Sequence, residues 1–305
     1  MTHPPAGPTL PDIAGIGLRA PHYSEVLEQR PALGWVEVHS ENFFGGGASL
    51  HTLLQVAQHY PVSLHGVGMG LASPDPLDAG HLRELRRLCD AVGPASVSEH
   101  LCWNTVGGVA INDLLPFPYT RDALRHVAGR VQQVQDILGR RILIENLSYY
   151  IAFRESEMRE EEFLAELVAH SGCGILFDVN NLFVNAVNLG VDAQAFIRGI
   201  PADAVGEYHL AGPSMMDGCL VDTHSAPVYD AAWALYEDAL RHIGKRPTLI
   251  EWDVDIPALP VLQREACKAQ QRMDAMDSCQ ASLSRGRERE RLPSLPEGER
   301  VGERG

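Results

Sequence analysis

The sequence predicts a (β/α)8 barrel, an α/β fold, on two observations. Eight short apolar or β-branched runs recur along the chain, and stretches with helical periodicity lie between them. Side chains of the kinds that bind metal ions end most of these runs. A doubly wound open sheet is the main alternative, but its ligand-binding residues would gather at one switch point. We therefore expect a closed barrel with its site at the C-terminal strand ends.

The predicted elements follow in order along the chain. The expected strands are residues 14–19, 34–39, 61–66, 95–100, 141–146, 174–179, 205–210 and 247–252. Helical spacing of apolar residues is clear in, for example, residues 78–91, 120–138, 160–170, 228–243 and 258–276. The glycine-rich segment FFGGGAS at 43–49 follows the second strand, and it predicts either a lid or a turn at the active face.

Length and composition predict one catalytic domain followed by a tail. A chain of 305 residues with 45% hydrophobic content can bury a large core, and barrels of about 250 residues commonly form one domain. Residues 278–305 hold six Arg and five Glu among Ser, Pro and Gly, and their apolar content is too low for packing. We predict a barrel domain at 1–277 and a disordered tail at 278–305.

Charge and cysteine usage restrict the class of partner. The net charge of −15 opposes nucleic-acid binding, which draws on clustered Lys and Arg, and the only lysines are Lys245 and Lys268. Six cysteines without C-x-x-C spacing argue against a disulfide framework or a thiolate zinc site. Neither a signal peptide nor an apolar run of about 18 residues is evident. We expect a cytoplasmic protein that binds neither nucleic acid nor membrane.

Nine potential metal ligands lie at or just after the predicted strand ends. In a barrel these ends converge on one mouth, so residues far apart in sequence can share metal ions. A carboxylate that ends an apolar strand is costly to desolvate unless it is paired or metal-bound. Nine nitrogen and oxygen ligands exceed the needs of one ion, so we predict two or three ions with a bridging carboxylate. The nine residues are His65, His100, Glu145, Asp178, Asn181, His209, Asp222, His224 and Glu251.

The donor types limit the metal without choosing it. Imidazole and carboxylate donors without thiolate fit iron, manganese or zinc. Glu145 and Glu251 are the candidates for the bridging carboxylate, and these two residues with His209 are the expected catalytic residues.

Other polar residues near the mouth have less certain roles. His39, Glu41 and Asn42 follow the second strand, and we expect them either to support the ligands and contact substrate or to shape the loop. Cys102 lies close to His100 in sequence, and we expect a small buried hydrophobic side chain there rather than a catalytic thiol.

At these residues the chain resembles the multinuclear non-haem iron-dependent oxidative enzymes, which are xylose-isomerase-like barrels of the methanobactin and bufferin type that modify ribosomally made peptides. Any one of the shared motifs is weak, but together they are specific. They run from about residue 12 to residue 262 and read GIGLR, GWVEVHSENFFG, LHGVGMGLAS, SEHLCW, LLPFPYT, ILIENLSYY, FDVNNLFVNAVNLG, EYHLAG, DTHSAPV and LIEWD.

The resemblance implies a reaction and a ligand set. It implies two or three iron ions in a mixed-valent Fe2+/Fe3+ cluster, with Asp178 either a ligand or a support for Asn181 or for a ligand histidine. The implied ligands are His65, His100, Glu145, Asn181, His209, Asp222, His224 and Glu251. It implies that the cluster activates O2 while a cysteine thiolate of a precursor peptide coordinates one iron. The cysteine would be oxidised by four electrons to thiooxazole, or to oxazolone with thioamide, in copper-binding peptides. It also implies a leader-binding partner protein that forms a heterodimer with the enzyme.

Three other functions share parts of this pattern. A divalent-metal sugar isomerase would use the same barrel and donors, but such enzymes usually place a lysine near the substrate, and neither lysine here is at a strand end. A trinuclear zinc endonuclease would share the donors, but the acidic charge opposes it. A non-enzymatic metal-storage or scaffold protein would have a saturated site. Open coordination positions and turnover of a peptide would distinguish the favoured reading.

Overall fold

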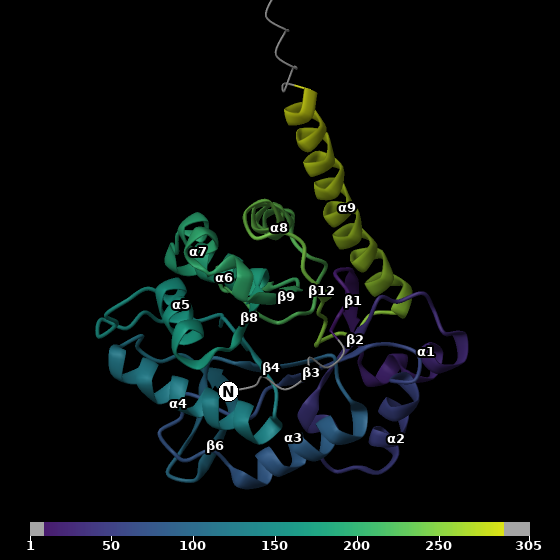
Figure 1. Ribbon diagram of the computed structural model, residues 1–305. Helices are drawn as coiled ribbons and strands as arrows, with labels where there is room; N and C mark the ends of the chain where they lie inside the picture. The colour runs from purple at the N-terminus through teal and green to yellow at the C-terminus, as the bar shows by residue number, and fades with distance from the viewer. Residues whose placement is uncertain (1–8, 290–305) are drawn as a thin grey trace, which may run out of the picture.

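The chain forms a closed barrel of eight parallel strands surrounded by helices (Figure 1). The computed structural model describes residues 9–289, and it describes side chains for residues 9–276. The predicted barrel is confirmed, and each barrel strand lies within one of the eight predicted runs. In order around the barrel the strands are β1 (Ala14–Gly17), β12 (Thr248–Ile250), β9 (Val205–Leu210), β8 (Gly174–Asp178), β7 (Leu143–Glu145), β4 (Ser96–His100), β3 (Val62–Gly66) and β2 (Val36–His39).

Helices alternate with the barrel strands along the chain, and each of the five stretches given as helical examples overlaps one of them. Their ends follow local sequence signals: Thr120 caps α4 by accepting a hydrogen bond from the Ala123 N–H, and Gly139 ends it with a φ of 65°. The helices are α1 (Tyr23–Gln29), α2 (Gly47–Val56), α3 (Ala79–Val92), α4 (Arg121–Leu138), α5 (Glu160–Ser171), α6 (Val179–Leu189), α7 (Ala193–Gly199), α8 (Asp230–His242) and α9 (Leu259–Arg289).

Strand alternation separates the apolar layer from the polar barrel interior. The fully buried Tyr208 ring packs against Tyr236 of α8 at 5.5 Å and against Phe177 at 5.8 Å. Successive side chains of a strand point to opposite faces, so the next residues, Asp178 and His209, face the barrel axis. These two residues are cross-strand partners. The register therefore brings polar side chains together inside the barrel, while aromatic rings fill the layer beneath the helices.

Short additional elements extend the C-terminal end of the barrel. Two antiparallel hairpins follow β4 and β9: β5 (Trp103–Val106) with β6 (Val109–Leu115), and β10 (Ser214–Met216) with β11 (Cys219–Val221). The 3-10 helices are η1 (Ala20–His22), η2 (Ser40–Phe43) and η3 (Ala202–Ala204). The segment 43–49, expected as a lid or a turn, is a short turn that joins η2 to α2, with Gly46 and Gly47 at φ 66°.

The last helix continues beyond the predicted domain boundary. Residues 278–289, assigned to a disordered tail from their composition, extend α9, which projects away from the barrel (Figure 1). A helix that is already nucleated by packed residues grows by one hydrogen bond per added residue, so residues that do not pack on the barrel can continue it. The remainder of the predicted tail, residues 290–305, lies outside the described residues. Among the described helices, none is long and apolar enough to span a membrane.

One glycine controls how the loop after β9 packs. A Cβ atom on Gly212 would lie 2.1 Å from the Ala226 carbonyl oxygen and 2.4 Å from that of Pro227. Because both atoms are backbone, Gly212→Ala is expected to destabilise the protein by about 1–3 kcal/mol, as overpacking does. Urea unfolding would measure it. Gly129→Ala, in the middle of α4 with open space around it, is the control and should raise stability by about 0.5–1 kcal/mol. Equal effects would contradict the packing argument.

Candidate metal centre

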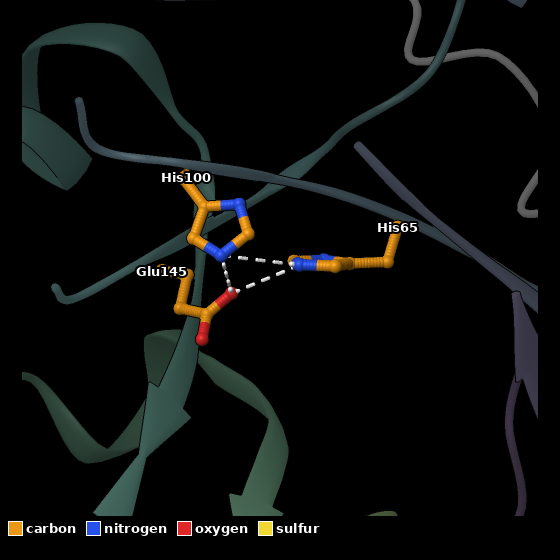
Figure 2. Close-up of side chains that lie close together, drawn as sticks. All are labelled: His65, His100 and Glu145. Carbon is orange, nitrogen blue, oxygen red and sulfur yellow. Dashed lines mark hydrogen bonds and ion pairs between the residues drawn. The ribbon is translucent and has the colours of Figure 1, made fainter. Parts of the chain in front are cut away.

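Three of the predicted ligands converge on one point at the ends of β3, β4 and β7. The Nε2 atoms of His65 and His100 lie 3.2 and 3.3 Å from Oε2 of Glu145, and 3.4 Å from one another (Figure 2). All three side chains are buried. Glu145 Oε2 has no hydrogen-bond partner that meets ordinary geometry. Two imidazole nitrogens and a carboxylate oxygen facing one another in this way form a first potential metal position.

Neighbouring groups orient both rings of this first position. His65 Nδ1 lies 2.8 Å from Ser98 Oγ, and His100 Nδ1 lies 2.9 Å from the Gly66 carbonyl oxygen. A proton on Nδ1 of His100 is required to satisfy that carbonyl, which leaves the Nε2 lone pair free for a metal ion. Burial lowers the pKa of both rings, most strongly that of His65, so they are neutral at pH 7. The geometry is thus already that of a ligand pair.

A second group lies around His209 at the end of β9. Its Nδ1 is 3.1 Å from Glu251 Oε2 and 3.8 Å from Glu145 Oε1. Burial lowers the pKa of His209, but Glu37 and Glu251 outweigh burial and raise it well above its usual range. The ring therefore carries a positive charge between carboxylates. Metal binding at Nδ1 would displace one of its protons.

Asp178 and Asn181 complete the side of the site near α6. Asp178 accepts a 2.6 Å hydrogen bond from the Asn181 N–H and so caps the helix, while its other oxygen has no partner. Burial raises its pKa to about 7. The Asn181 amide nitrogen donates to the Asn146 carbonyl at 2.9 Å and lies 3.5 Å from Glu145 Oε1, which leaves the Asn181 Oδ1 atom without a partner. The cap of α6 therefore leaves two oxygen atoms, Asp178 Oδ2 and Asn181 Oδ1, available as donors near Glu145.

The third group is the D-x-H pair of the loop after β11. His224 Nε2 lies 2.7 Å from Asp222 Oδ1, and its Nδ1 lies 3.4 Å from Glu251 Oε2. The backbone of His224 is left-handed, with φ 47°, a conformation that is costly for a non-glycine residue. Asp253 holds the ring through a 2.9 Å contact at Nδ1. The structure therefore brings all nine predicted ligands to one end of the barrel, and their role as ligands remains a prediction.

Several site residues were missing from the sequence-based prediction. Arg19 donates from Nε to Asp253 Oδ1 at 2.8 Å and lies 3.4 Å from Glu251 Oε1, so it holds one oxygen of Glu251 and leaves the other facing His209. His39 Nε2 lies 3.0 Å from an Arg19 nitrogen and 3.7 Å from Glu251 Oε1. This contact is the supporting role that the sequence allowed for His39.

The structure also shows the surroundings of Glu41, Asn42 and Cys102. The Glu41 carboxylate accepts hydrogen bonds from the N–H groups of Val67 and Gly68 at 2.9 and 2.8 Å, so it shapes the loop after β3. Asn42 is exposed. Cys102 is fully buried, and burial raises the pKa of its thiol, as expected of a small apolar side chain.

Two further glutamates lie beneath His209, inside the barrel. Glu37 and Glu207 are fully buried, and they place oxygens 3.3 and 3.6 Å from His209 Nε2. Ser63 donates a 2.9 Å hydrogen bond to Glu37. Each glutamate precedes a histidine by two residues on its strand, a spacing that could have identified both as facing the axis. Their carboxylates fix the ring so that Nδ1 points to the other ligands.

Removing one of these carboxylates tests this orientation. Glu37→Gln keeps the volume but removes the carboxylate charge that lies 3.3 Å from His209 Nε2, so metal affinity is expected to fall by about 10–100-fold. Competition with a chelator of known affinity would measure it. Ser63→Ala leaves the Glu37 carboxylate in place and should have a smaller effect. An unchanged affinity in Glu37→Gln would show that the barrel interior does not control His209.

The residues present fit a metal cluster. Buried oxygen atoms of Glu145, Asp178 and Asn181 have no hydrogen-bond partner, and such atoms are costly unless an ion or water satisfies them. Among the described residues the buried carboxyl groups of the site outnumber its buried arginine, Arg19, and bound cations would stabilise their charged forms. The donors described above are nitrogen and oxygen atoms, which suit iron, manganese or zinc.

Comparisons with known proteins identify the family. A family model described as "RiPP precursor modification enzyme MbnB/TglH/ChrH" matches residues 13–274. A UPF0276 protein of Chromobacterium violaceum is 60% identical over 262 residues, which cover 86% of this chain and 95% of that protein. A UPF0276 protein of Acaryochloris marina is 48% identical over 256 residues, covering 84% of this chain and 93% of that protein.

Solved structures support the fold class at low sequence identity. An L-ribulose 3-epimerase is 14% identical with a TM-score of 0.56, covering 93% of this chain and 99% of that one. A xylose isomerase domain protein of Alicyclobacillus acidocaldarius is 14% identical with a TM-score of 0.51, covering 87% of this chain and 97% of that one. This likeness shows the fold alone, whereas the match over residues 13–274 spans the barrel and all nine converging residues. The chain belongs to the MbnB/TglH/ChrH family of RiPP precursor modification enzymes.

Proposed function

We propose that the protein is a multinuclear iron oxidoreductase that uses O2 to oxidise cysteine residues of a ribosomally made precursor peptide. The observation that carries this proposal is the sharing of carboxylates between groups. Glu145 turns Oε2 to His65 and His100 and Oε1 toward His209, while Glu251 turns Oε2 to both His209 and His224. Two carboxylates placed in this way can each bridge neighbouring ions, which supports two or three metal positions.

The protein's residues would hold and orient the ions. His65, His100 and Glu145 would hold the first, and the groups around His209 and His224 would hold the others. Iron bound there would supply the electron transfer between a cysteine thiolate and O2. The groups contain no thiolate of their own, so the substrate would bring the soft donor to the cluster.

Contacts with Arg19 and His39 limit how Glu251 can bind a metal ion. Arg19 and His39 occupy the side of Oε1, so Glu251 offers mainly Oε2 to the ions. A carboxylate that binds through one oxygen leaves coordination positions open for substrate and O2. The substrate we propose is a precursor peptide presented by a leader-binding partner protein, in the cytoplasm.

Metal analysis is the decisive experiment. The protein would be purified anaerobically from iron-supplemented cells, and its metal content and Mössbauer spectrum would be measured on one sample. Two or three irons per chain with a mixed-valent signal are expected, and His209→Ala should lose both. Peptides encoded beside the gene would then be tested for loss of four hydrogens per modified cysteine. Stoichiometric zinc with little iron would contradict the proposal and favour a hydrolase, an isomerase or a structural site.

A further inference from the structure

A pocket of about 310 Å³ lies between the segment after β6, the loop after β7, α5 and α7. Figure 1 shows α5, α6 and α7 together on one side of the barrel. Its lining includes four aromatic residues, Phe117, Tyr119, Tyr149 and Phe153, together with charged residues such as Glu160 and Arg159. The Phe117 and Tyr119 rings are buried and meet edge to face at 5.4 Å, so this part of the wall is held by packing. This volume lies at the lower end of the range for ligand pockets, and it can hold one lysine or arginine side chain.

A buried carboxyl group without a cation lines this aromatic wall. Glu160 is 4% exposed, and neither of its oxygens has a hydrogen-bond partner of ordinary geometry, although the Tyr119 and Tyr149 hydroxyls and the Leu147 N–H lie near enough to lower its pKa in part. The cation next to it in sequence, Arg159, pairs instead with Glu161 at 3.0 Å. Burial raises the pKa of Glu160 to about 8, as expected of a carboxyl group that lacks a cationic neighbour.

The loop after β7 connects this pocket to the metal centre. Ser148 donates a 2.9 Å hydrogen bond to Asp222, and the Tyr150 hydroxyl accepts one from the Asp222 N–H at 3.0 Å. Tyr149 and Ile151, which alternate with these residues, line the pocket. One short segment therefore contacts a candidate ligand with two of its residues and the pocket with two others. A bound chain that crosses the segment would reach both.

We propose that this pocket binds the cationic side chain of a lysine or arginine in the peptide whose cysteine lies at the metal centre, a proposal that rests on the proposed function. Aromatic faces attract ammonium and guanidinium groups, and a desolvated carboxylate pairs with them. The apolar wall suits the methylene stem of such a side chain. The net charge of −15 also favours a basic peptide.

Binding of small probes to the full chain tests the pocket without any turnover. The probes are the N-acetyl, N-methylamide derivatives of lysine and arginine, with the norleucine derivative as a neutral control, and titration calorimetry measures Kd. The lysine and arginine probes are expected to bind at least about tenfold more tightly than the norleucine probe. Glu160→Gln should abolish this preference. Glu166→Gln, an exposed position on the same helix, should leave it unchanged.

A second variant tests the pocket while Glu160 is kept. Ala195, a half-buried residue of α7, lines the pocket, so Ala195→Leu should fill it and weaken binding of the lysine probe at least about tenfold without a change of charge. Equal binding of the norleucine probe, unaltered preference in Glu160→Gln, or binding by none of the probes would overturn the proposal. Iron content and cysteine oxidation are measured separately on the unmodified protein. A failure there with intact probe binding would refute the proposed function and leave the cation site standing.

Discussion

Glu145→Gln is expected to remove most of the bound metal while the barrel stays folded. Glu145 is the carboxylate that faces His65 and His100 with one oxygen and His209 with the other, so its loss affects more than one ion. The neutral amide cannot bridge two cations, and the two histidines alone provide too few donors for a stable site. Metal content per chain after anaerobic purification measures the effect, and we expect a fall from two or three ions to fewer than one.

A matched substitution and a stability measurement make this prediction specific. Glu99→Gln replaces an equally buried carboxyl group on β4 whose oxygens accept the N–H groups of His100 and Met69, and it should retain the metal. Burial raises the pKa of Glu145 well above its usual range, so the metal-free protein is strained by this group near neutral pH. Metal-free Glu145→Gln should therefore unfold at urea concentrations no lower than the metal-free parent. Lower stability together with full metal content would show a structural role instead.

The sequence predicted the barrel and the convergence of its site because both depend on short-range patterns. Apolar runs ending in His65, His100 or Glu145 place these side chains at strand ends, and the closed parallel topology then brings strand ends together. His100 and Glu145 are partners in the register of the adjacent strands β4 and β7, although they lie 45 positions apart in the sequence (145 − 100). The prediction that these side chains lie close together therefore does not depend on their separation in the sequence.

The supporting contacts were not predictable in the same way. Arg19 ends the predicted run 14–19 and Asp253 follows the run 247–252, but the two residues are 234 positions apart and nothing in the sequence pairs them. Their pairing depends on the side-chain conformations of a finished site. Residues 278–289 illustrate a different limit of composition: it predicts disorder there, whereas α9 continues through these residues to Arg289. The pocket around Glu160 is likewise assembled from four separate segments, and its aromatic residues read as ordinary core positions in the sequence.

Glu160→Gln is expected to stabilise the ligand-free protein increasingly as pH rises. The folded pKa of Glu160, about 8, lies above the reference value of 4.5 for an exposed glutamate, because burial disfavours the charged form. At pH values below the reference value both states of the parent are protonated, so the group contributes no pH-dependent penalty. Between the two pKa values only the unfolded chain ionises, so the parent loses about 1.4 kcal/mol of stability per pH unit, or about 4–5 kcal/mol across the interval.

Urea unfolding of metal-free protein at pH 4.5 and pH 8.5 measures this effect as the change in the stability difference between variant and parent. Taking the difference cancels other titrating groups, since all of them are common to both chains. Glu166→Gln, exposed on the same helix, should show a difference that hardly changes with pH. At high pH the lysine probe should reduce the difference in unfolding free energy between Glu160→Gln and the parent. The reason is that a cation beside the carboxylate replaces the solvation that burial removes. If the stability difference between variant and parent did not change with pH, Glu160 would already be ionised and paired in the folded protein.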